Sequence, residues 1–474
     1  MTELVVGPFN RVEGDLEVRL DVSDGRVTAA YANSPLFRGF ETMLTGADPR
    51  DALTLTPRIC GICSISQSAA AAHALAAASG ASMAPQGALA AAILHGVENL
   101  ADHVTHFYLF FMPDFARIEY KGRDWHDGMV DKFTATKGSS QRAALDARAR
   151  LFHVTGVLGG KWPHTLAIQP AGVTRTPTAS EKVRMKATFR TFRRFLEGQL
   201  FGAALEEFLA CGSASDLDAW NTGDAGLFFQ AGQSLGLAEM GQGPRRFLSY
   251  GAYPQGAGRA TAAGVWRDGA VRDVEPDAIV EHVAHSWMEG AGAHPFDGAT
   301  APDEAMAEPG YSWCKAPRLS GEAVEVGAFA RQVVDGQALA VALADEGGVR
   351  ARIAGRLIEI ARTQLWLEEW VEALDPDARF MGEFEVPQDG RGFGLVEAAR
   401  GSLGHWVVIE GGRIANYQIV APTTWNFSPR DDTGQPGPLE AALVGAPVDA
   451  GETAPLSVQH IVRSFDPCMV CTVH

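Results

Sequence analysis

The chain has 474 residues, and its 46% hydrophobic and 20% charged content is ordinary for a soluble globular protein. A chain of this length can bury a large core in one elaborated domain or in several. Its net charge of −17 argues against nucleic acid or an anionic membrane as the main partner. The N-terminus lacks a basic region followed by an apolar stretch, and no apolar run is long enough to span a membrane. We therefore expect a cytoplasmic protein without direct membrane insertion.

Residues 1–35 are expected to form a β-hairpin. Hydrophobic and polar residues alternate on both sides of Ser23-Asp24-Gly25, and an Asp-Gly pair is typical of a tight turn. From about Asp51 the composition becomes Ala-rich, and apolar residues at three-and-four spacing predict a helical core over 51–375. The predicted helices are 64–79, 86–110, 140–156, 179–210, 274–290 and 321–372.

Two Gly-rich stretches, 211–265 and 290–312, are expected to be ordered loops because aromatic residues interrupt them. A second hairpin is predicted around Gly411-Gly412, within a C-terminal segment 395–474 that also holds a metal-binding tail. No internal repeat or low-complexity linker divides the chain. We therefore predict a single, predominantly helical α+β unit over 1–474, with long central helices and peripheral β-hairpins.

Four of the six cysteines form two C-x-x-C pairs, Cys60 with Cys63 and Cys468 with Cys471. Six cysteines in so long a chain do not suggest a disulfide framework. Four thiolates are a soft ligand set that suits zinc, an iron–sulfur cluster or nickel.

A structural zinc site is the plainest interpretation of these cysteines, but such sites are usually compact modules with closely spaced ligands. Here nearly the whole chain separates the two pairs. The site must then form inside a completed fold, a location that excludes water and suits catalysis at a metal. The spacing therefore favours a buried, functional metal site.

Together with their neighbours, the cysteine motifs resemble those of nickel–iron hydrogenase large subunits, and the likeness runs along nearly the whole chain. Ten fragments occur in the family's order, so coincidence is a poor explanation. The resemblance implies the fold of that family. The fragments are RVEG (11–14), RGFE (38–41), RICGIC (58–63), DHVTHFY (102–108), GGKWPH (159–164), HPFDG (294–298), YSWCKAPR (311–318), EAARGSLGHW (397–406), APTTWN (421–426) and DPCMVCTVH (466–474).

The resemblance implies that all four cysteines bind nickel. Cys60 and Cys468 would be terminal ligands, whereas Cys63 and Cys471 would also bridge to iron. The iron is expected to carry one carbon monoxide and two cyanides, which no side chain supplies. The implied cofactor is thus a Ni-Fe(CN)2(CO) centre.

The protein must then cradle those diatomic groups. By resemblance, Arg400 would donate to one cyanide and Thr423 to the other. Ala398 and Ala399 would leave apolar space beside the carbonyl. For Arg400 alone, a surface salt bridge would be the simpler interpretation. The residues expected to pair with a guanidinium above the site are Asp102 and Asp466.

A second cation, Mg²⁺ or a related divalent ion, is implied near the chain end. Glu41, a backbone carbonyl near Ile419 and His474 match the family's ligand positions. Carboxylate and carbonyl oxygens suit such a hard ion. The imidazole is less typical, and a terminal histidine is ordinarily part of a frayed tail, so His474 rests on the resemblance alone.

The implied activity is heterolytic cleavage of H2. This nonpolar molecule requires a metal to hold hydride and a nearby base to take the proton, which would be Cys471, Cys468 or Arg400. Glu13 matches the family's buried proton relay. A carboxyl group near apolar residues has a raised proton affinity, which suits that role. A lone Glu beside a strand would more often be solvated.

Electrons must leave through a partner. Cys211 and Cys314 stand alone and fit buried packing residues, so the chain has no spare cysteine set for an iron–sulfur cluster. The family supplies a small subunit that carries such clusters. We expect a heterodimer, or a dimer of heterodimers, and a sensor histidine kinase as a further partner.

Departures from the family pattern favour its regulatory, hydrogen-sensing group. Energy-converting members usually have a His four positions after Cys63, where this chain has Gln67. A neutral amide cannot act as an imidazolium, so the hydrogen bond to the bridging sulfur should differ. Gas-channel positions that are often Val and Leu are Ile62 and Phe110 here, which should hinder oxygen more than hydrogen. Both are also ordinary core residues.

The end of the sequence at His474 fits either a sensor without a cleaved extension or a mature form. We therefore predict a slow, oxygen-tolerant, hydrogen-sensing hydrogenase. The alternative is an energy-conserving uptake hydrogenase. A non-catalytic electron-transfer subunit is disfavoured because related ones have generally lost the four cysteines, and a structural zinc protein remains the last alternative.

Overall fold

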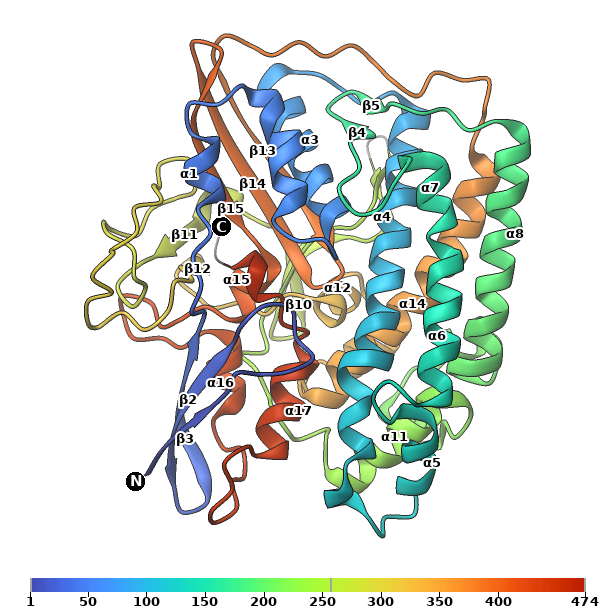
Figure 1. Ribbon diagram of the computed structural model, residues 1–474, viewed down its shortest axis with the longest axis vertical. Helices are drawn as coiled ribbons and strands as arrows, with labels where there is room; N and C mark the ends of the chain where they lie inside the picture. Colours follow the sequence, from blue (N-terminus) through green and yellow to red (C-terminus); the bar gives the residue numbers. More distant parts are fainter. Residues whose placement is uncertain (1, 256–257, 473–474) are drawn as a thin grey trace.

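The computed structural model describes residues 2–255 and 258–472. Its N-terminal sheet contains three antiparallel strands in the order β1 (Thr2–Val6), β2 (Glu17–Ser23) and β3 (Arg26–Asn33). The predicted hairpin of β2 and β3 is confirmed, and β1 adds a strand that was not predicted. One face of the hairpin, with Val18 and Leu20, is buried. This sheet lies at the edge of the molecule, far from the long helices (Figure 1).

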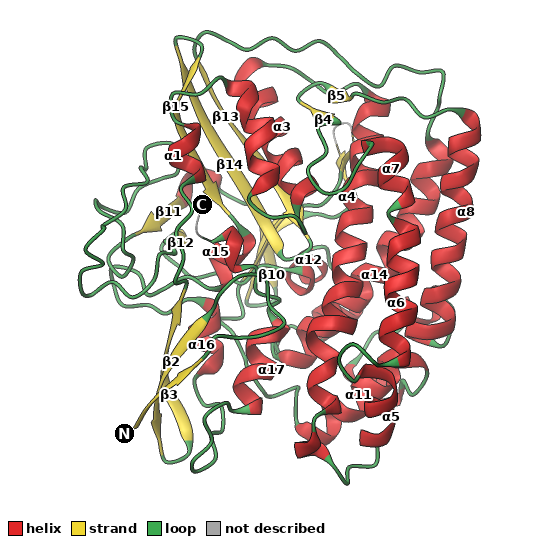
Figure 2. Cartoon of the chain, in the orientation of Figure 1, coloured by secondary structure: helices red, strands yellow, loops and turns green. Residues whose placement is uncertain are grey.

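The long helices other than α3 stand side by side and form one half of the molecule, whereas α3 lies against the C-terminal sheet (Figure 2). Helix α4 packs against α6 and α14 within this half and also contacts α3. The sequence marks several of their ends: Pro85 opens α4, Gly80 with φ 72° ends α3, and Thr178 with Glu181 forms a capping box before α8. These helices are α3 (Ser64–Ser79), α4 (Pro85–Thr105), α6 (Ser139–Leu151), α8 (Ala179–Phe195) and α14 (Val349–Ala373).

Shorter helices connect and cover these elements. Single π-helical turns, His106–Phe111 and Leu196–Phe201, extend α4 and α8. The short helices are α1 (Phe40–Leu44), α2 (Ala52–Leu55), α5 (His126–Phe133), α7 (His153–Gly159), α9 (Leu205–Leu209), α10 (Ala214–Ala219), α11 (Gly223–Leu235), α12 (Ala328–Val334), α13 (Ala338–Ala342), α15 (Pro422–Asn426), α16 (Pro438–Leu443) and α17 (Leu456–Ser464).

The C-terminal sheet contains β13 (Gly390–Ala398), β14 (Gly401–Glu410) and β15 (Arg413–Val420) in antiparallel order. The predicted hairpin of β14 and β15 is confirmed, and β13 is an additional strand. Helix α3 lies across this sheet (Figure 1). The approach is close at Gly394, where a Cβ atom would lie 2.0 Å from the carbonyl oxygen of Ala70. Unlike the N-terminal sheet, this one is largely buried, and β13 ends two residues before the buried Arg400.

The prediction of a helix over 274–290 is wrong. Pro276 begins only a single helical turn, and β11 (Ile279–His282) follows, paired with β12 (Ala316–Leu319). The apolar and charged residues of this segment match both the helical period and the strand period. Pairing with the distant strand β12 decides in favour of the strand. The remaining strands are β4 (Ile168–Gln169), β5 (Gly172–Val173), β6 (Phe247–Tyr250), β7 (Pro254–Gln255), β8 (Gly258–Arg259), β9 (Ala263–Arg267) and β10 (Ala270–Arg272).

The predicted helix 321–372 is divided into α12, α13 and α14. Gly327, Gly336 and Gly347 have positive φ angles, which a side chain rarely adopts, and they lie at the breaks. The stretch 211–265 holds α10, α11 and several strands as well as loops. In the described part of the chain, no helix is long and apolar enough to cross a bilayer.

Candidate metal centre

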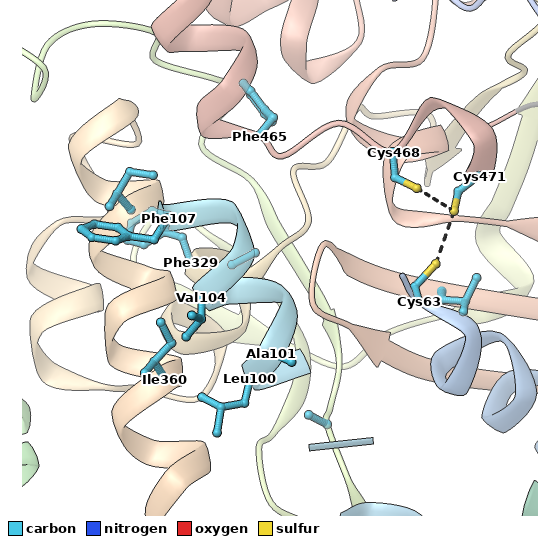
Figure 3. Close-up of a cluster of buried hydrophobic side chains, with 14 of the residues drawn as sticks. Cys63, Leu100, Ala101, Val104, Phe107, Phe329, Ile360, Phe465, Cys468 and Cys471 are labelled. Carbon is cyan, nitrogen blue, oxygen red and sulfur yellow. Dashed lines mark hydrogen bonds between the residues drawn. The ribbon is translucent and has the colours of Figure 1, made fainter. Parts of the chain in front are cut away.

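The four paired cysteines converge on one point in the interior. Cys60 lies just before α3, and Cys63 is the N-cap residue of that helix. Cys468 precedes a short helical turn near the chain end, and Cys471 is the last residue of that turn. All four are buried, and their sulfur atoms lie within 4.8 Å of one another. Figure 3 shows three of them, Cys63, Cys468 and Cys471, turned towards one another.

The sulfur atoms face one another across the two pairs. Cys60 Sγ lies 3.4 Å from Cys468 Sγ, and Cys63 Sγ lies 3.4 Å from Cys471 Sγ. None of the four forms a disulfide in the described structure. Hydrogen bonding to Cys468 holds the pKa of Cys60 well below its ordinary value, whereas burial raises that of Cys468. Four soft donors around one dry point fit a thiolate-bound metal centre.

Arg400 lies beside the thiols, between two aspartates. Its Nη1 donates to Asp102 Oδ2 at 2.8 Å, and its Nη2 donates to Asp466 Oδ1 at 3.1 Å. Its Nε donates to the carbonyl oxygen of Asp466 at 3.0 Å. Sequence analysis expected both aspartates to pair with a guanidinium, and the structure places them so.

The two carboxylates differ in their electrostatics. Burial raises the pKa of Asp102 to about 8, although Arg400 opposes this effect. Burial raises the pKa of Asp466, but Arg400 and the neighbouring basic side chains together lower it below its ordinary value. Within the described residues, Asp102 Oδ1 and Asp466 Oδ2 have no hydrogen-bond partner. Buried polar atoms without a hydrogen-bond partner commonly contact a bound ligand, ion or water.

The other expected neighbours of the diatomic groups also lie near the pairs. The hydroxyl oxygen of Thr423 accepts a hydrogen bond from the backbone N–H of Cys468 at 3.2 Å. Ala398 and Ala399 are buried before Arg400, and their carbonyl oxygens accept from Arg331 at 2.8 and 3.1 Å. Whether their methyl groups line the carbonyl of the iron stays a prediction.

Gln67 is fully buried one helical turn after Cys63. Its Oε1 lies 2.7 Å from His405 Nε2, and His405 Nδ1 lies 2.8 Å from the hydroxyl of Tyr417. Sequence analysis placed His405 in a motif but gave it no role. The partner is 338 residues away, so only the folded chain reveals this contact.

Glu13 lies alongside the second cysteine pair. Its backbone N–H donates to the carbonyl of Pro467 at 3.2 Å, and the N–H of Met469 donates to its carbonyl at 2.7 Å. The side chain is half-buried. Burial and the neighbouring Cys60 raise its pKa, the direction that sequence analysis expected for a relay.

At the predicted cation site, the backbone N–H of Ile419 donates to Glu41 Oε1 at 2.7 Å. Binding of a cation by Glu41 and a carbonyl near Ile419 stays a prediction. The ammonium of Lys315 lies 3.5 Å from Glu41 Oε2 and donates to Gln418 at 2.6 Å. A buried cationic side chain thus accompanies this carboxylate. His474 lies outside the described residues.

The two predicted gas-channel residues lie on different segments, Ile62 between the cysteines of the first pair and Phe110 after α4. Ile62 is partly buried and packs against the main core. Phe110 lies half-exposed in the π-helical turn after α4, and its carbonyl accepts from Arg11 at 3.2 Å. Their role in gas access stays a prediction.

Comparisons of the sequence and of the structure with known proteins all find hydrogenases. The model of the nickel-dependent hydrogenase family matches residues 38–121 and 141–474. The large subunit of the periplasmic [NiFeSe] hydrogenase of Desulfomicrobium baculatum is 31% identical, with 100% of this chain and 95% of that protein covered. The uptake hydrogenase large subunit of Afipia carboxidovorans is 27% identical, with 99% and 94% covered. The crystal structure of the Ni-Fe-Se hydrogenase from D. vulgaris Hildenborough superposes with a TM-score of 0.88 at 28% identity, with both chains fully covered.

Proposed function

Because this chain belongs to the nickel-dependent hydrogenase family and is therefore an oxidoreductase enzyme, we propose that it is a large subunit that cleaves H2 at a nickel–iron centre held by its two C-x-x-C pairs. One observation carries the proposal: four buried thiols from opposite ends of the chain lie within 4.8 Å of one another. A bound nickel–iron pair supplies the acceptor for the electron pair of H2. The cysteines supply its anionic, water-free setting.

The place of each cysteine in its motif, first or second of the pair, supports a division of roles among the thiolates. Cys60 and Cys468, 3.4 Å apart, are proposed as the terminal ligands of nickel. Cys63 and Cys471, also 3.4 Å apart, are proposed to bridge nickel and iron. Each proposed role thus draws one cysteine from each end of the chain.

The surrounding residues are proposed to hold the diatomic groups of the iron. Each terminal nitrogen of Arg400 carries two hydrogens, and the bonds to Asp102 and Asp466 use one apiece, so others remain for a cyanide. Thr423 accepts from Cys468, which leaves its own hydroxyl hydrogen to donate. Ala398 and Ala399 are proposed to line the carbonyl.

Glu13 is proposed to carry the proton away from the thiolates. Its raised pKa places proton binding closer to neutral pH, as a relay requires. Glu13→Gln should retain the metals but suppress hydrogen/deuterium exchange. Unchanged exchange in a metal-loaded variant would remove Glu13 from the path.

The proposed partner is a small subunit that carries iron–sulfur clusters. Cys211 and Cys314 are separated in sequence and outside the four-thiol cluster, so in the described residues the only such cluster is already assigned. Relatives of this chain are named as large subunits, which supports a two-subunit enzyme. The opposite-end origin of the thiols also supports a single functional unit over the whole chain.

Two physiological roles remain to be distinguished. The relatives named as uptake hydrogenases favour hydrogen uptake over the hydrogen-sensing role predicted from the sequence. One observation favours sensing as a second candidate: Gln67 is a buried amide bonded to His405 beside the first pair. Rapid turnover without signal transfer to a kinase would support uptake, and slow turnover with such transfer would support sensing.

Other features of the proposal rest on sequence alone. Ile62 and Phe110 are proposed to restrict oxygen, and a Mg²⁺ near Glu41 is proposed despite the closeness of Lys315. Replacing Ile62 with Val and Phe110 with Leu should make activity sensitive to oxygen. Continued activity in air would argue against the gate. A cytoplasmic location also remains a prediction, and the relative from D. baculatum is named as periplasmic.

Infrared spectroscopy and elemental analysis of the purified complex test the central proposal. We expect one nickel per large subunit, together with cyanide and carbonyl absorption. Cys468→Ser should abolish both, whereas Cys211→Ser, which alters an isolated thiol, should change neither. Zinc as the sole metal, without diatomic bands, would overturn the proposal.

A further inference from the structure

We propose that Glu98 is a positioning residue that sets the first C-x-x-C pair against the rest of the metal centre, an inference that rests on the proposed function. Glu98 lies on α4 and is 1% exposed. It contacts the start of α3, the helix whose first turn follows Cys63. No motif singled out in the sequence contains it.

Glu98 supplies the acceptors that the start of α3 lacks. Cys63 at the N-cap makes no side-chain capping bond. Instead, the backbone N–H of Ile65 donates to Glu98 Oε2 at 2.8 Å, and that of Ser66 donates to Oε1 at 2.9 Å. The hydroxyls of Ser64 and Ser66 donate at 3.3 and 3.0 Å. A carboxylate from another helix thus caps α3, where the helix dipole favours negative charge.

The segment 159–164 contacts the carboxylate of Glu98 from another side. Trp162 Nε1 donates to Glu98 Oε2 at 3.1 Å. In the same segment, the N–H of His164 donates to Ser64 Oγ at 3.3 Å, and its Nδ1 lies 2.9 Å from the carbonyl oxygen of Pro57. The GGKWPH motif, which the proposed chemistry leaves without a role, therefore packs around the loop that carries the first pair.

Helix α4 connects this cap to Arg400. Asp102 follows Glu98 by one turn, so both side chains project from the same face. Asp102 pairs with Arg400 at 2.8 Å, and Arg400 in turn contacts Asp466, two residues before Cys468. A single rigid helix thereby relates Cys63 to the opposite thiol pair. The loss of the cap should displace Cys63 without removing any ligand.

The test compares Glu98→Gln with Glu440→Gln in the purified two-subunit enzyme. Glu440 is an equally buried glutamate on α16 that accepts from Ala32 N–H at 3.0 Å and from the Tyr311 hydroxyl at 2.8 Å, outside the centre. An amide in place of Glu98 presents an NH2 group to one of the two backbone donors. We expect nickel retention in chelator to fall about tenfold or more, with shifted cyanide and carbonyl bands. Glu440→Gln should change neither quantity.

Trp162→Phe provides a milder second variant, because it removes one donor and spares the backbone bonds. It should shift the bands in the same direction by a smaller amount, which keeps the test decisive if Glu98→Gln does not fold. Wild-type nickel content and bands in both variants would overturn the positioning role. Absence of nickel from the wild-type enzyme would instead overturn the proposed function.

Discussion

The buried ion pair between Arg400 and Asp466 should contribute to the free energy of unfolding. Removing one charge from a buried ion pair leaves the other charge poorly compensated, at a cost of about 3 kcal/mol. Asp466 has a φ of 58°, a conformation that Asn also tolerates, so Asp466→Asn changes the charge and keeps the backbone. We expect the free energy of unfolding, measured in urea, to fall by about that amount.

An exposed ion pair gives the matched control. Arg379 and Glu383 lie 3.8 Å apart with side chains that are 66% and 95% exposed. Glu383→Gln should alter the free energy of unfolding by less than about 1 kcal/mol because solvent screens the pair. Equal effects of both substitutions would show that burial does not strengthen the Arg400 contact.

At the residue scale, motif likeness anticipated which side chains gather but not every partner. It placed Arg400 with Asp102 and Asp466, since these types occur in recognisable fragments. It missed the Gln67 contact with His405 and the cap by Glu98, because hydrogen-bond partners far apart in sequence leave no local pattern.

At the scale of elements, the packing of α3 on β13 depends on a missing side chain. A Cβ at Gly394 would lie 2.0 Å from the carbonyl oxygen of Ala70 and 2.6 Å from the N atom of Ala74. Gly394→Ala should push the helix from the sheet and destabilise the fold by about 3 kcal/mol. Thermal unfolding monitored by circular dichroism would measure this loss.

Gly156 in α7 is the control, since a Cβ there meets nothing within 4 Å. Gly156→Ala should leave stability unchanged or raise it by up to about 1 kcal/mol, because Ala favours the helix. A stable Gly394→Ala variant would mean that α3 can move without strain.

The junction of α16 with β3 should make stability depend on pH. Burial raises the pKa of Glu440 from 4.5 to about 7. The folded protein therefore binds a proton more tightly, so this stabilisation is full below pH 4.5 and is lost as pH rises towards 7. The loss is about 3 kcal/mol at most.

Glu440→Gln should remove that dependence. We expect urea midpoints of the variant and the wild type to agree at pH 5, and the variant to be more stable at pH 7.5. Parallel pH profiles for the two proteins would contradict the assigned cause. The comparison isolates this carboxyl because each protein is measured at both pH values.

Elements were predictable where local pattern and tertiary packing agree. The hairpin of β2 and β3 follows from alternation around an Asp-Gly turn, and α3 follows from an Ala-rich run that begins after Cys63 and ends at Gly80. The strand β11 was assigned to a helix because its pairing with β12 is non-local. Strands β1 and β13 were also missed, since each pairs with a strand that local pattern had already placed in a hairpin.

At the scale of the whole molecule, the metal centre ties together segments 408 residues apart. The tail that carries Cys468 and Cys471 is also held by Arg400 and by backbone bonds to Glu13. The proposed centre would add metal–sulfur bonds from both Cys468 and Cys471 to these contacts. Because a metal bound only by the folded state stabilises that state, its removal should loosen the tail first.

Hydrogen exchange measured by mass spectrometry, with and without metal, would test this expectation. Amide hydrogens of residues 468–472 should exchange faster in the metal-free protein, and those of 58–63 should follow. The strands β2 and β3 should be unaffected, since their ladder lies apart from the cysteines. Equal protection of the tail in both forms would mean that Arg400 and Glu13 hold it without metal, and the thiols would then be arranged before the metals arrive.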